Sequence, residues 1–386
     1  MSKENPKKSY ETQSSPSGKT ILFLCDDYGY HAGWSRVAKN LFTGSNKILE
    51  EGIAFFSSGK LKDRPPLIHD DILFSKSSSL FFIFIIYDFL RVLWRIRNQK
   101  IKVIHCLVEP YIPLAHFLSI FLRVKLVITI HGTYSIIPNS SVLKNIYFKS
   151  FRKAHAISSI SEFTANRFRE TWGDFKNLEV VYLGADHKIF RPNFKLSKEK
   201  YFIFVGTIKE RKGLLPTLQA FEKILKDFPN YKFILITEKG MGASSTGKYF
   251  NSVMEICERN KQNIIFRGKV SEEELVKLYQ KASANVLISL SNDQVFEGFG
   301  LIHVEANLCG CLTIGGVNSP NEEIIKNAFN GYLADASNMD SIANAFRCII
   351  DKLEGSSSKN ISNDCRTAGE RFSWDSFIDW SLKQYF

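Results

Sequence analysis

The sequence predicts an α/β protein built from two doubly wound parallel sheets, each covered by helices on both faces. Short apolar runs of strand length alternate with helical patterns, and the alternation begins again near residue 200. A length of 386 residues is enough for about two domains. We therefore expect a disordered polar tail at 1–18, domains at 19–190 and 191–370, and a C-terminal helix at 371–386 that crosses back to the first domain.

In the first half, the predicted strands are nearly unbroken apolar runs, which is typical of parallel strands buried on both faces. They lie at 20–25, 101–106, 125–130 and 154–158, and a helix follows from Ser161 as its N-cap.

In the second half, strands are predicted at 201–205, 231–236, 263–266, 284–290 and 311–314, with a helix at 216–226. Capping boxes at Ser271–Glu274 and Ser319–Glu322 mark two further helix starts, the second with Pro320 as the first helical residue. Gly310 is the expected C′ residue of the helix after Gly300. The stretch from 186 to 200 is polar around Pro192 and is the expected linker.

The segment Leu80–Trp94 is the most apolar of the chain, but Asp88 and Arg91 interrupt it. A spanning helix needs about 20 apolar residues, so a membrane span is not expected. As a helix it would carry Asp88, Arg91 and Arg95 on one face and a wide apolar face opposite. That apolar face either packs on the protein's own sheet or docks on a bilayer.

Charge and cysteine content narrow the function classes. Lys and Arg outnumber Asp and Glu by 51 to 39, and residues 1–190 hold 26 basic against 16 acidic residues. The surplus favours an anionic partner, but the basic residues are scattered between apolar runs without a nucleic-acid motif, so no nucleic acid is expected. The N-terminus has no secretory signal, and the seven cysteines show no CxxC spacing, as in a cytosolic protein with reduced thiols.

The strongest motif runs from Phe296 to Ala306, between a strand and a helix. Its glycines allow a ligand to approach the backbone, and the first helical amides would face an anion. The two carboxylates suit hydrogen bonds from sugar and ribose hydroxyls. The expected binding residues are Glu297, Gly298, Phe299, Gly300, Leu301 and Glu305.

Two further strand ends carry polar residues that would meet this motif. Gly206 ends one strand, and the Arg211–Lys212 pair that follows would neutralise a diphosphate. His131 ends a strand of the first half, where an imidazole can donate to a sugar or phosphate oxygen.

The motif from Glu297 to Glu305 resembles the E-x7-E motif of the retaining glycosyltransferases of family 4, which have the GT-B fold. The resemblance covers roughly residues 19–386. It implies that Arg211 and Lys212 hold the donor diphosphate, that His131 contacts the donor sugar, and that Lys269 and Val270 lie at the nucleotide base. It also implies that Gly33 belongs to the glycine-rich first loop, although Ala32 replaces one usual glycine and Leu183 replaces a usual asparagine.

The expected function is retaining transfer of a hexose-like sugar from a UDP- or GDP-sugar to a glycan or lipid-linked acceptor, as in polysaccharide biosynthesis. Glu297 and His131 are the expected catalytic residues. No metal or other cofactor is expected, because no DxD motif lies near the sugar site and Arg211 and Lys212 can offset the leaving charge. The protein is expected in the cytoplasm, bound peripherally to the inner face of an anionic membrane. A non-catalytic glycan- or nucleotide-binding protein and a sugar-nucleotide epimerase of the same fold stay open.

Overall fold

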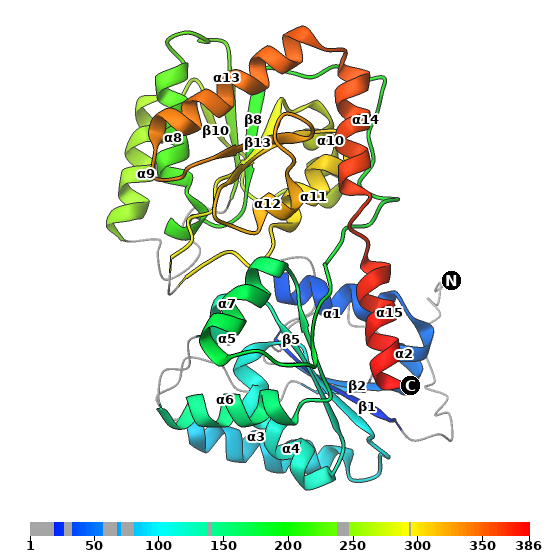
Figure 1. The fold of residues 1–386 in the computed structure, drawn as a ribbon. Coiled ribbons are helices and arrows are strands. Elements are labelled where there is room, and N and C mark those ends of the chain that lie inside the picture. Colours follow the sequence, from blue (N-terminus) through cyan, green and yellow to red (C-terminus); the bar gives the residue numbers. More distant parts are fainter. Residues whose placement is uncertain are drawn as a thin grey trace, which may run out of the picture.

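The computed structural model describes residues 19–26, 33–56, 68–70, 81–136, 141–237, 247–292 and 295–386. They form two α/β domains, one above the other in Figure 1, joined by an extended linker and by the last helix. The predicted tail at 1–18 lies outside the described residues, as does Ala32. In the part of the chain that the structure describes, no helix is both long and apolar enough to cross a membrane.

The N-terminal domain is a seven-stranded sheet in the order β3-β2-β1-β4-β5-β6-β7, in which every pair is parallel. Its strands are β1 (Ile21–Cys25), β2 (Gly52–Phe56), β3 (Ile68–Asp70), β4 (Val103–Cys106), β5 (Lys125–Ile130), β6 (Ala156–Ser159) and β7 (Leu178–Val180).

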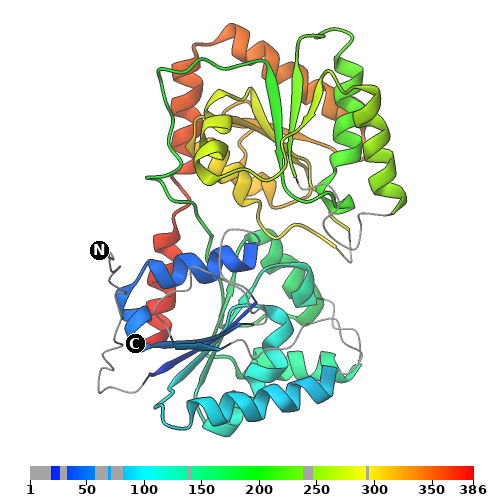
Figure 2. The ribbon, with the colours of Figure 1, turned by 180° about the vertical axis from the view of Figure 1, so that it is seen from behind.

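Alternation along β1 sends side chains into two separate cores. Phe23 packs in the core shared with the last helix, whereas Leu22 and Leu24 pack in the core on the other face of the sheet. The helices of this domain are α1 (Gly33–Thr43), α2 (Asn46–Glu51), α3 (Phe81–Ile96), α4 (Ile112–Leu122), α5 (Thr133–Ile136), α6 (Ser141–Lys153) and α7 (Glu162–Trp172). Helices α3, α4 and α6 cover one face, and α1 and α2 cover the other (Figures 1 and 2).

The C-terminal domain is a six-stranded parallel sheet in the order β10-β9-β8-β11-β12-β13. Its strands are β8 (Tyr201–Val205), β9 (Lys232–Ile236), β10 (Ile264–Phe266), β11 (Ala284–Leu287), β12 (Leu312–Gly316) and β13 (Gly331–Ala334). Its helices are α8 (Leu214–Ile224), α9 (Lys248–Arg259), α10 (Glu272–Lys281), α11 (Leu301–Leu308), α12 (Asn321–Ile324), α13 (Met339–Gly355) and α14 (Ser358–Gly369). The two doubly wound sheets predicted from the sequence are thereby confirmed.

Several local predictions are confirmed and others need correction. Ser271 caps α10, and Gly310 follows α11 with a φ of 73°. Pro320 is the N-cap of α12 rather than its first helical residue. Strand β11 ends at Leu287 instead of residue 290, because the next residues turn toward the neighbouring loop, where the Leu290 amide donates to the Arg211 carbonyl at 2.8 Å.

The last helix, α15 (Trp374–Tyr385), leaves the C-terminal domain and lies beside α1 on the N-terminal sheet (Figure 2). Its aromatic residues pack around the buried side chain of His105 on β4. The Tyr385 hydroxyl and the His105 Nδ1 atom are hydrogen-bonded to each other. The two ends of the described chain therefore belong to one domain.

Candidate active site

Most of the predicted donor-site residues of the C-terminal domain lie on the two loops that follow the neighbouring strands β8 and β11, or on helix α11 after the second loop. After β8 the chain makes a short 3-10 turn, Glu210–Lys212, and enters α8 through Gly213. Gly213 has a φ of 60°, and a Cβ atom there would lie 2.0 Å from the Ile288 carbonyl oxygen. Only glycine permits this approach, which brings the basic turn against the loop that carries Glu297.

Glu297, Arg211 and Lys212 form one charge cluster at this place. Arg211 makes an ion pair with Glu297, and the Lys212 ammonium reaches back over Gly206, where a Cβ atom would lie 2.8 Å from Nζ. Burial alone would raise the pKa of Glu297, but Lys212 and Arg211 hold it below its ordinary value. Burial lowers the pKa of Lys212, which Glu297 partly offsets. The cluster holds two cations and one carboxylate at the carboxyl ends of the strands.

The loop after β5 brings His131 to the other side of this cluster. A Cβ atom at Gly298 would lie 1.8 Å from the His131 carbonyl oxygen, so the two domains touch here through their backbones. The His131 amide donates to the buried carboxylate of Glu109 at 2.5 Å, and its Nε2 atom is 2.8 Å from the Leu107 carbonyl oxygen. The structure thus brings the His131 backbone against Gly298, the residue that follows Glu297.

The second carboxylate of the motif, Glu305, is buried on α11 and pairs with Arg36 of the N-terminal domain. Burial raises the pKa of Glu305, although Arg36 opposes the shift. Both residues line a pocket at the hinge together with Asp186 and Glu272. Arg36 was not predicted from the sequence as a site residue.

The first turn of α11 starts from Gly300, which has a φ of 104° and acts as the N-cap without a side-chain hydrogen bond. The Leu301 amide is therefore among the backbone donors at this helix start. Phe299 is buried and its ring packs against Tyr182 and Phe372, so only its main chain faces the loop region.

The remaining predicted residues lie on other segments than these two loops and α11. Lys269 and Val270 lie between β10 and α10; Lys269 is exposed, and Val270 packs against the core. Gly33 is the first residue of α1, and a Cβ atom there would meet no described residue within 4 Å.

The N-terminal domain also holds the Glu297 loop by contacts that the sequence did not reveal. Ser161 Oγ and Thr164 Oγ1, at the start of α7, donate to the Gly298 carbonyl at 2.6 and 3.1 Å. Thr133 Oγ1 donates to the Phe296 carbonyl and accepts from the Phe296 amide, both at 3.0 Å. Ser161 is the N-cap of α7, as predicted, and has this second role as well.

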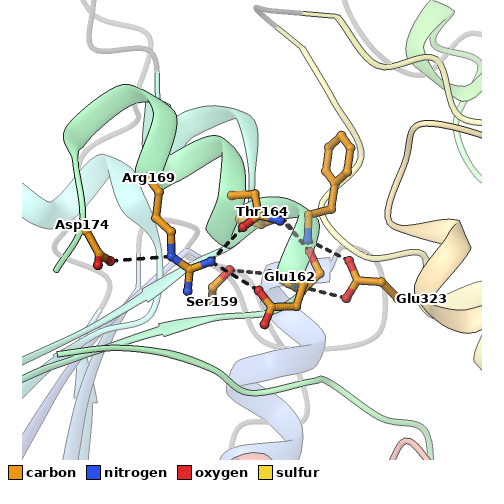
Figure 3. A network of polar contacts seen from close by, with 9 residues as sticks. Ser159, Glu162, Thr164, Arg169, Asp174 and Glu323 are labelled. Carbon is orange, nitrogen blue, oxygen red and sulfur yellow. Dashed lines mark hydrogen bonds and ion pairs between the residues drawn. The ribbon is translucent and has the colours of Figure 1, made fainter. Parts of the chain in front are cut away.

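Glu323 of the C-terminal domain reaches the N-terminus of α7 (Figure 3). Its two carboxylate oxygens accept from the backbone amides of Glu162 and Phe163 at 2.9 and 2.8 Å. A carboxylate is stabilised there by the unpaired amides and the helix dipole. The start of α7 thus contacts the C-terminal domain both at Gly298 and at Glu323. Within the described ranges, no three side chains converge as a metal-binding group.

Two family models match adjoining parts of the chain. Residues 52–189 match the model described as glycosyltransferase family 4, and residues 186–367 match glycosyl transferases group 1. Their border falls in the linker between the two domains.

Relatives and solved structures agree with these matches. An uncharacterised glycosyltransferase of Methanocaldococcus jannaschii is 24% identical over 68% of this chain and 69% of its own length. A GDP-mannose-dependent monoacylated alpha-(1-6)-phosphatidylinositol monomannoside mannosyltransferase of Corynebacterium glutamicum is 20% identical over 59% of this chain and 61% of its own. The matches thus span roughly two thirds of these relatives. The Anabaena HepE structure with UDP and glucose has the same fold, with a TM-score of 0.76, 15% identity, and coverage of 95% of this chain and 98% of HepE.

Proposed function

Because this chain belongs to the family-4 type of glycosyltransferases with the GT-B fold, we propose that it transfers a hexose from a UDP- or GDP-sugar with retention of anomeric configuration. The acceptor is the hydroxyl of a glycan or of a lipid-linked sugar. The donor binds to the C-terminal domain, and the acceptor approaches from the N-terminal one at an anionic membrane surface.

The observation that carries this proposal is the cluster of Arg211, Lys212 and Glu297. A departing nucleoside diphosphate carries negative charge, which two fixed cations at a strand end would stabilise as it develops. The cluster already balances one carboxylate against two cations, so it retains a positive charge for the diphosphate. We assign Arg211 and Lys212 to the diphosphate.

Glu297 and His131 are assigned to the sugar. The lowered pKa of Glu297 keeps it ionised, so it accepts hydrogen bonds from sugar hydroxyls and orients the ring. Its Arg211 partner would then move partly toward the phosphates. The assignment of retention rests on the family analogy, in which the acceptor attacks from the face that the diphosphate leaves.

In the C-terminal domain, the buried Glu305 is assigned to the ribose hydroxyls, and the Gly300–Leu301 amides to phosphate oxygens. Main-chain groups at Lys269 and Val270 are assigned to the base, and Gly33 to the phosphate side of the first loop. No metal is part of this proposal, because the cations and helix N-termini supply the charge compensation.

The test is release of nucleotide from UDP- and GDP-sugars in the absence of acceptor, followed by proton NMR of the anomeric centre of a transfer product. We expect slow hydrolysis of one donor class, loss of that activity in Glu297→Gln, and no loss in Glu258→Gln, an exposed surface glutamate. Arg211→Gln should weaken binding of the nucleotide-sugar about tenfold or more but hardly change binding of the nucleoside, because it removes one charge-assisted contact of about 1.5–3 kcal/mol.

Four results would each contradict a different part of the proposal. Binding without turnover of any donor favours a non-catalytic protein, and release of an epimerised nucleotide-sugar favours an epimerase. An inverted product would contradict retention alone. Equal losses for nucleoside and nucleotide-sugar in Arg211→Gln would show that Arg211 does not hold the diphosphate.

A further inference from the structure

The N-terminal domain exposes an apolar stripe on two neighbouring helices. On α3, Ile86, Leu90 and Trp94 follow one another at four-residue intervals and are 62%, 60% and 62% exposed. On α4, Ile120 and Phe121 are 50% and 63% exposed. We call these five residues the apolar stripe. The other side of α3 packs in the core through Val92 and Ile96, so the stripe is not needed to hold the helix on the sheet.

The two helices present the stripe as one continuous surface. Helix α3 contacts α4, and the rings of Phe89 and Phe121 lie edge to face at 5.6 Å. Helix α6 adjoins α4 and adds the partly exposed Phe148. All three helices lie on the outer face of the N-terminal sheet, away from α1 and α15 (Figure 1). Exposed apolar patches that are continuous over several side chains mark interaction surfaces.

The segment that carries the stripe exposes charge of one sign. Residues 81–153 contain eleven Lys and Arg but only two acidic residues, Asp88 and Glu109, and both acids are buried. Ten of the eleven basic residues are exposed, among them Lys144, Lys149 and Arg152 on α6. This segment therefore supplies almost the whole basic surplus of the first half and exposes it at the surface.

We propose that α3, α4 and α6 form a docking surface for an anionic phospholipid bilayer, with the apolar stripe inserted at the headgroup level and the basic residues bound to lipid phosphates. Helices with an apolar stripe bordered by Lys and Arg bind bilayer surfaces in this way. The proposal rests on the proposed function, because the bilayer is where a lipid-linked acceptor lies, and it names the surface that brings the enzyme there.

A second copy of the chain fits this surface poorly. A two-fold dimer places the same patch of each subunit opposite itself. The basic residues of α6 and of the α3 C-terminus would then face their own copies, with no exposed acid on the three helices to pair with them. An anionic bilayer offers negative charge to the basic residues and an apolar layer to the stripe.

The experiment is co-sedimentation of the full chain, without donor, with vesicles of phosphatidylcholine and phosphatidylglycerol at 7:3. Pure phosphatidylcholine vesicles are the comparison, each at low and high salt. We expect at least tenfold tighter binding to the anionic vesicles, reduced but not abolished by high salt. Ile86→Ser/Leu90→Ser should remove the salt-resistant part, and Lys144→Gln/Lys149→Gln the salt-sensitive part. Phe194→Ser/Met339→Ser, which changes two exposed apolar residues elsewhere, should bind as wild type does.

Several outcomes would overturn the docking surface. These are a wild-type protein that ignores anionic vesicles at low salt, stripe variants that bind normally, and stripe variants that turn a dimer into a monomer while vesicle binding persists. The last would identify a second copy as the occupant. Donor hydrolysis in solution is measured on the same variants and should stay unchanged. Hydrolysis without vesicle binding therefore refutes only the docking surface, and vesicle binding without turnover refutes only the transferase.

Discussion

Arg36 on α1 and Glu305 on α11 form an ion pair that joins the two domains across 269 positions of sequence. Glu305 is the second carboxylate of the donor-site motif and is almost fully buried, whereas Arg36 keeps about a fifth of its side-chain surface exposed. The same carboxylate therefore takes part in domain contact and in the proposed binding of the donor. If Glu305 binds the donor as proposed, breaking its ion pair with Arg36 should change donor binding as well as the contact between the domains.

Replacing Arg36 with Gln should destabilise the protein, because the buried Glu305 carboxylate would lose its cationic partner. We expect a loss of about 2–4 kcal/mol, seen as a lower thermal midpoint in calorimetry. Arg36→Gln/Glu305→Gln should recover much of that loss, because no buried charge is then left. Lys223→Gln, which breaks the exposed pair with Asp340, is the matched control and should leave the thermal midpoint nearly unchanged. If the loss of stability in the double variant equals the sum of the losses in the two single variants, the pair does not couple the domains.

Glu323→Gln tests the contact at the N-terminus of α7 (Figure 3). In wild type, two backbone amides of the other domain donate to the Glu323 carboxylate, which the variant lacks. Such a cap stabilises a helix start by about 1 kcal/mol. Since the contact exists only between the domains, we expect a more open average shape in small-angle X-ray scattering and a higher KM for the donor. The folding of each domain should be unaffected.

The adjacent Glu322 offers the control, because its carboxylate accepts from the Asn318 amide within the C-terminal domain. Glu322→Gln should leave both the scattering curve and KM unchanged. If the two variants behave alike, the contact of Glu323 with α7 does not govern closure.

The sequence predicted most of the fold because parallel strands buried on both faces appear as apolar runs. The predicted span of β5, 125–130, agrees with the observed strand, and that of β8 agrees as well. The edge strand β7 was not predicted, because it has only three residues and includes a glutamate. Strand β13 was also not predicted; only two of its four residues are buried, so no apolar run marks it.

The site residues that the sequence predicted belong to local patterns, whereas the site residues that it missed depend on partners far away in the sequence. The glycine-rich loop and the Arg211–Lys212 turn are local patterns, and the structure brings them together as neighbouring strand ends. Arg36, Ser161 and Glu323 find partners 269, 137 and 161 positions away, respectively. In one sequence, nothing marks an arginine in a helix or a glutamate near a proline as the partner of a distant group. The Ser161 N-cap signal was visible, but its contact with Gly298 was not.

The stability of the N-terminal domain should fall with acidity through His105. Burial lowers the pKa of this histidine to about 3 from 6.5. Between those two pH values the unfolded chain binds a proton that the folded chain does not, so stability is complete above pH 6.5 and declines as pH falls toward 3. The slope is up to about 1.4 kcal/mol per pH unit. In His105→Gln, the thermal midpoint should depend less on pH over this interval.

His155, an exposed histidine of the same domain, provides the comparison. His155→Gln should keep the wild-type thermal midpoint at neutral pH. A His105→Gln variant with the full wild-type slope would show that His105 is not the group that titrates on unfolding. Tyr385→Phe, which removes the hydroxyl bonded to His105, should lower stability by about 1 kcal/mol at neutral pH.

Gly298→Ala tests whether the close approach of the two domains is required for activity. The φ of Gly298 is not in the left-handed region, so alanine costs nothing there by backbone conformation alone. The cost is steric, because the new Cβ atom would lie 1.8 Å from the His131 carbonyl oxygen. One of the two loops must move, and His131 and Glu297 then lose their relative position. We expect kcat to fall at least a hundredfold, since misplacement by about 1 Å costs that much.

Gly355→Ala is the matched control, because a Cβ atom at this end of α13 meets nothing within 4 Å. That variant should keep full activity and be slightly more stable, since alanine narrows the unfolded ensemble. Circular dichroism of Gly298→Ala should show intact secondary structure, because both domains keep their own cores. Full activity in Gly298→Ala would mean that the loops adjust without consequence and that the contact between His131 and Gly298 does not position the reacting groups.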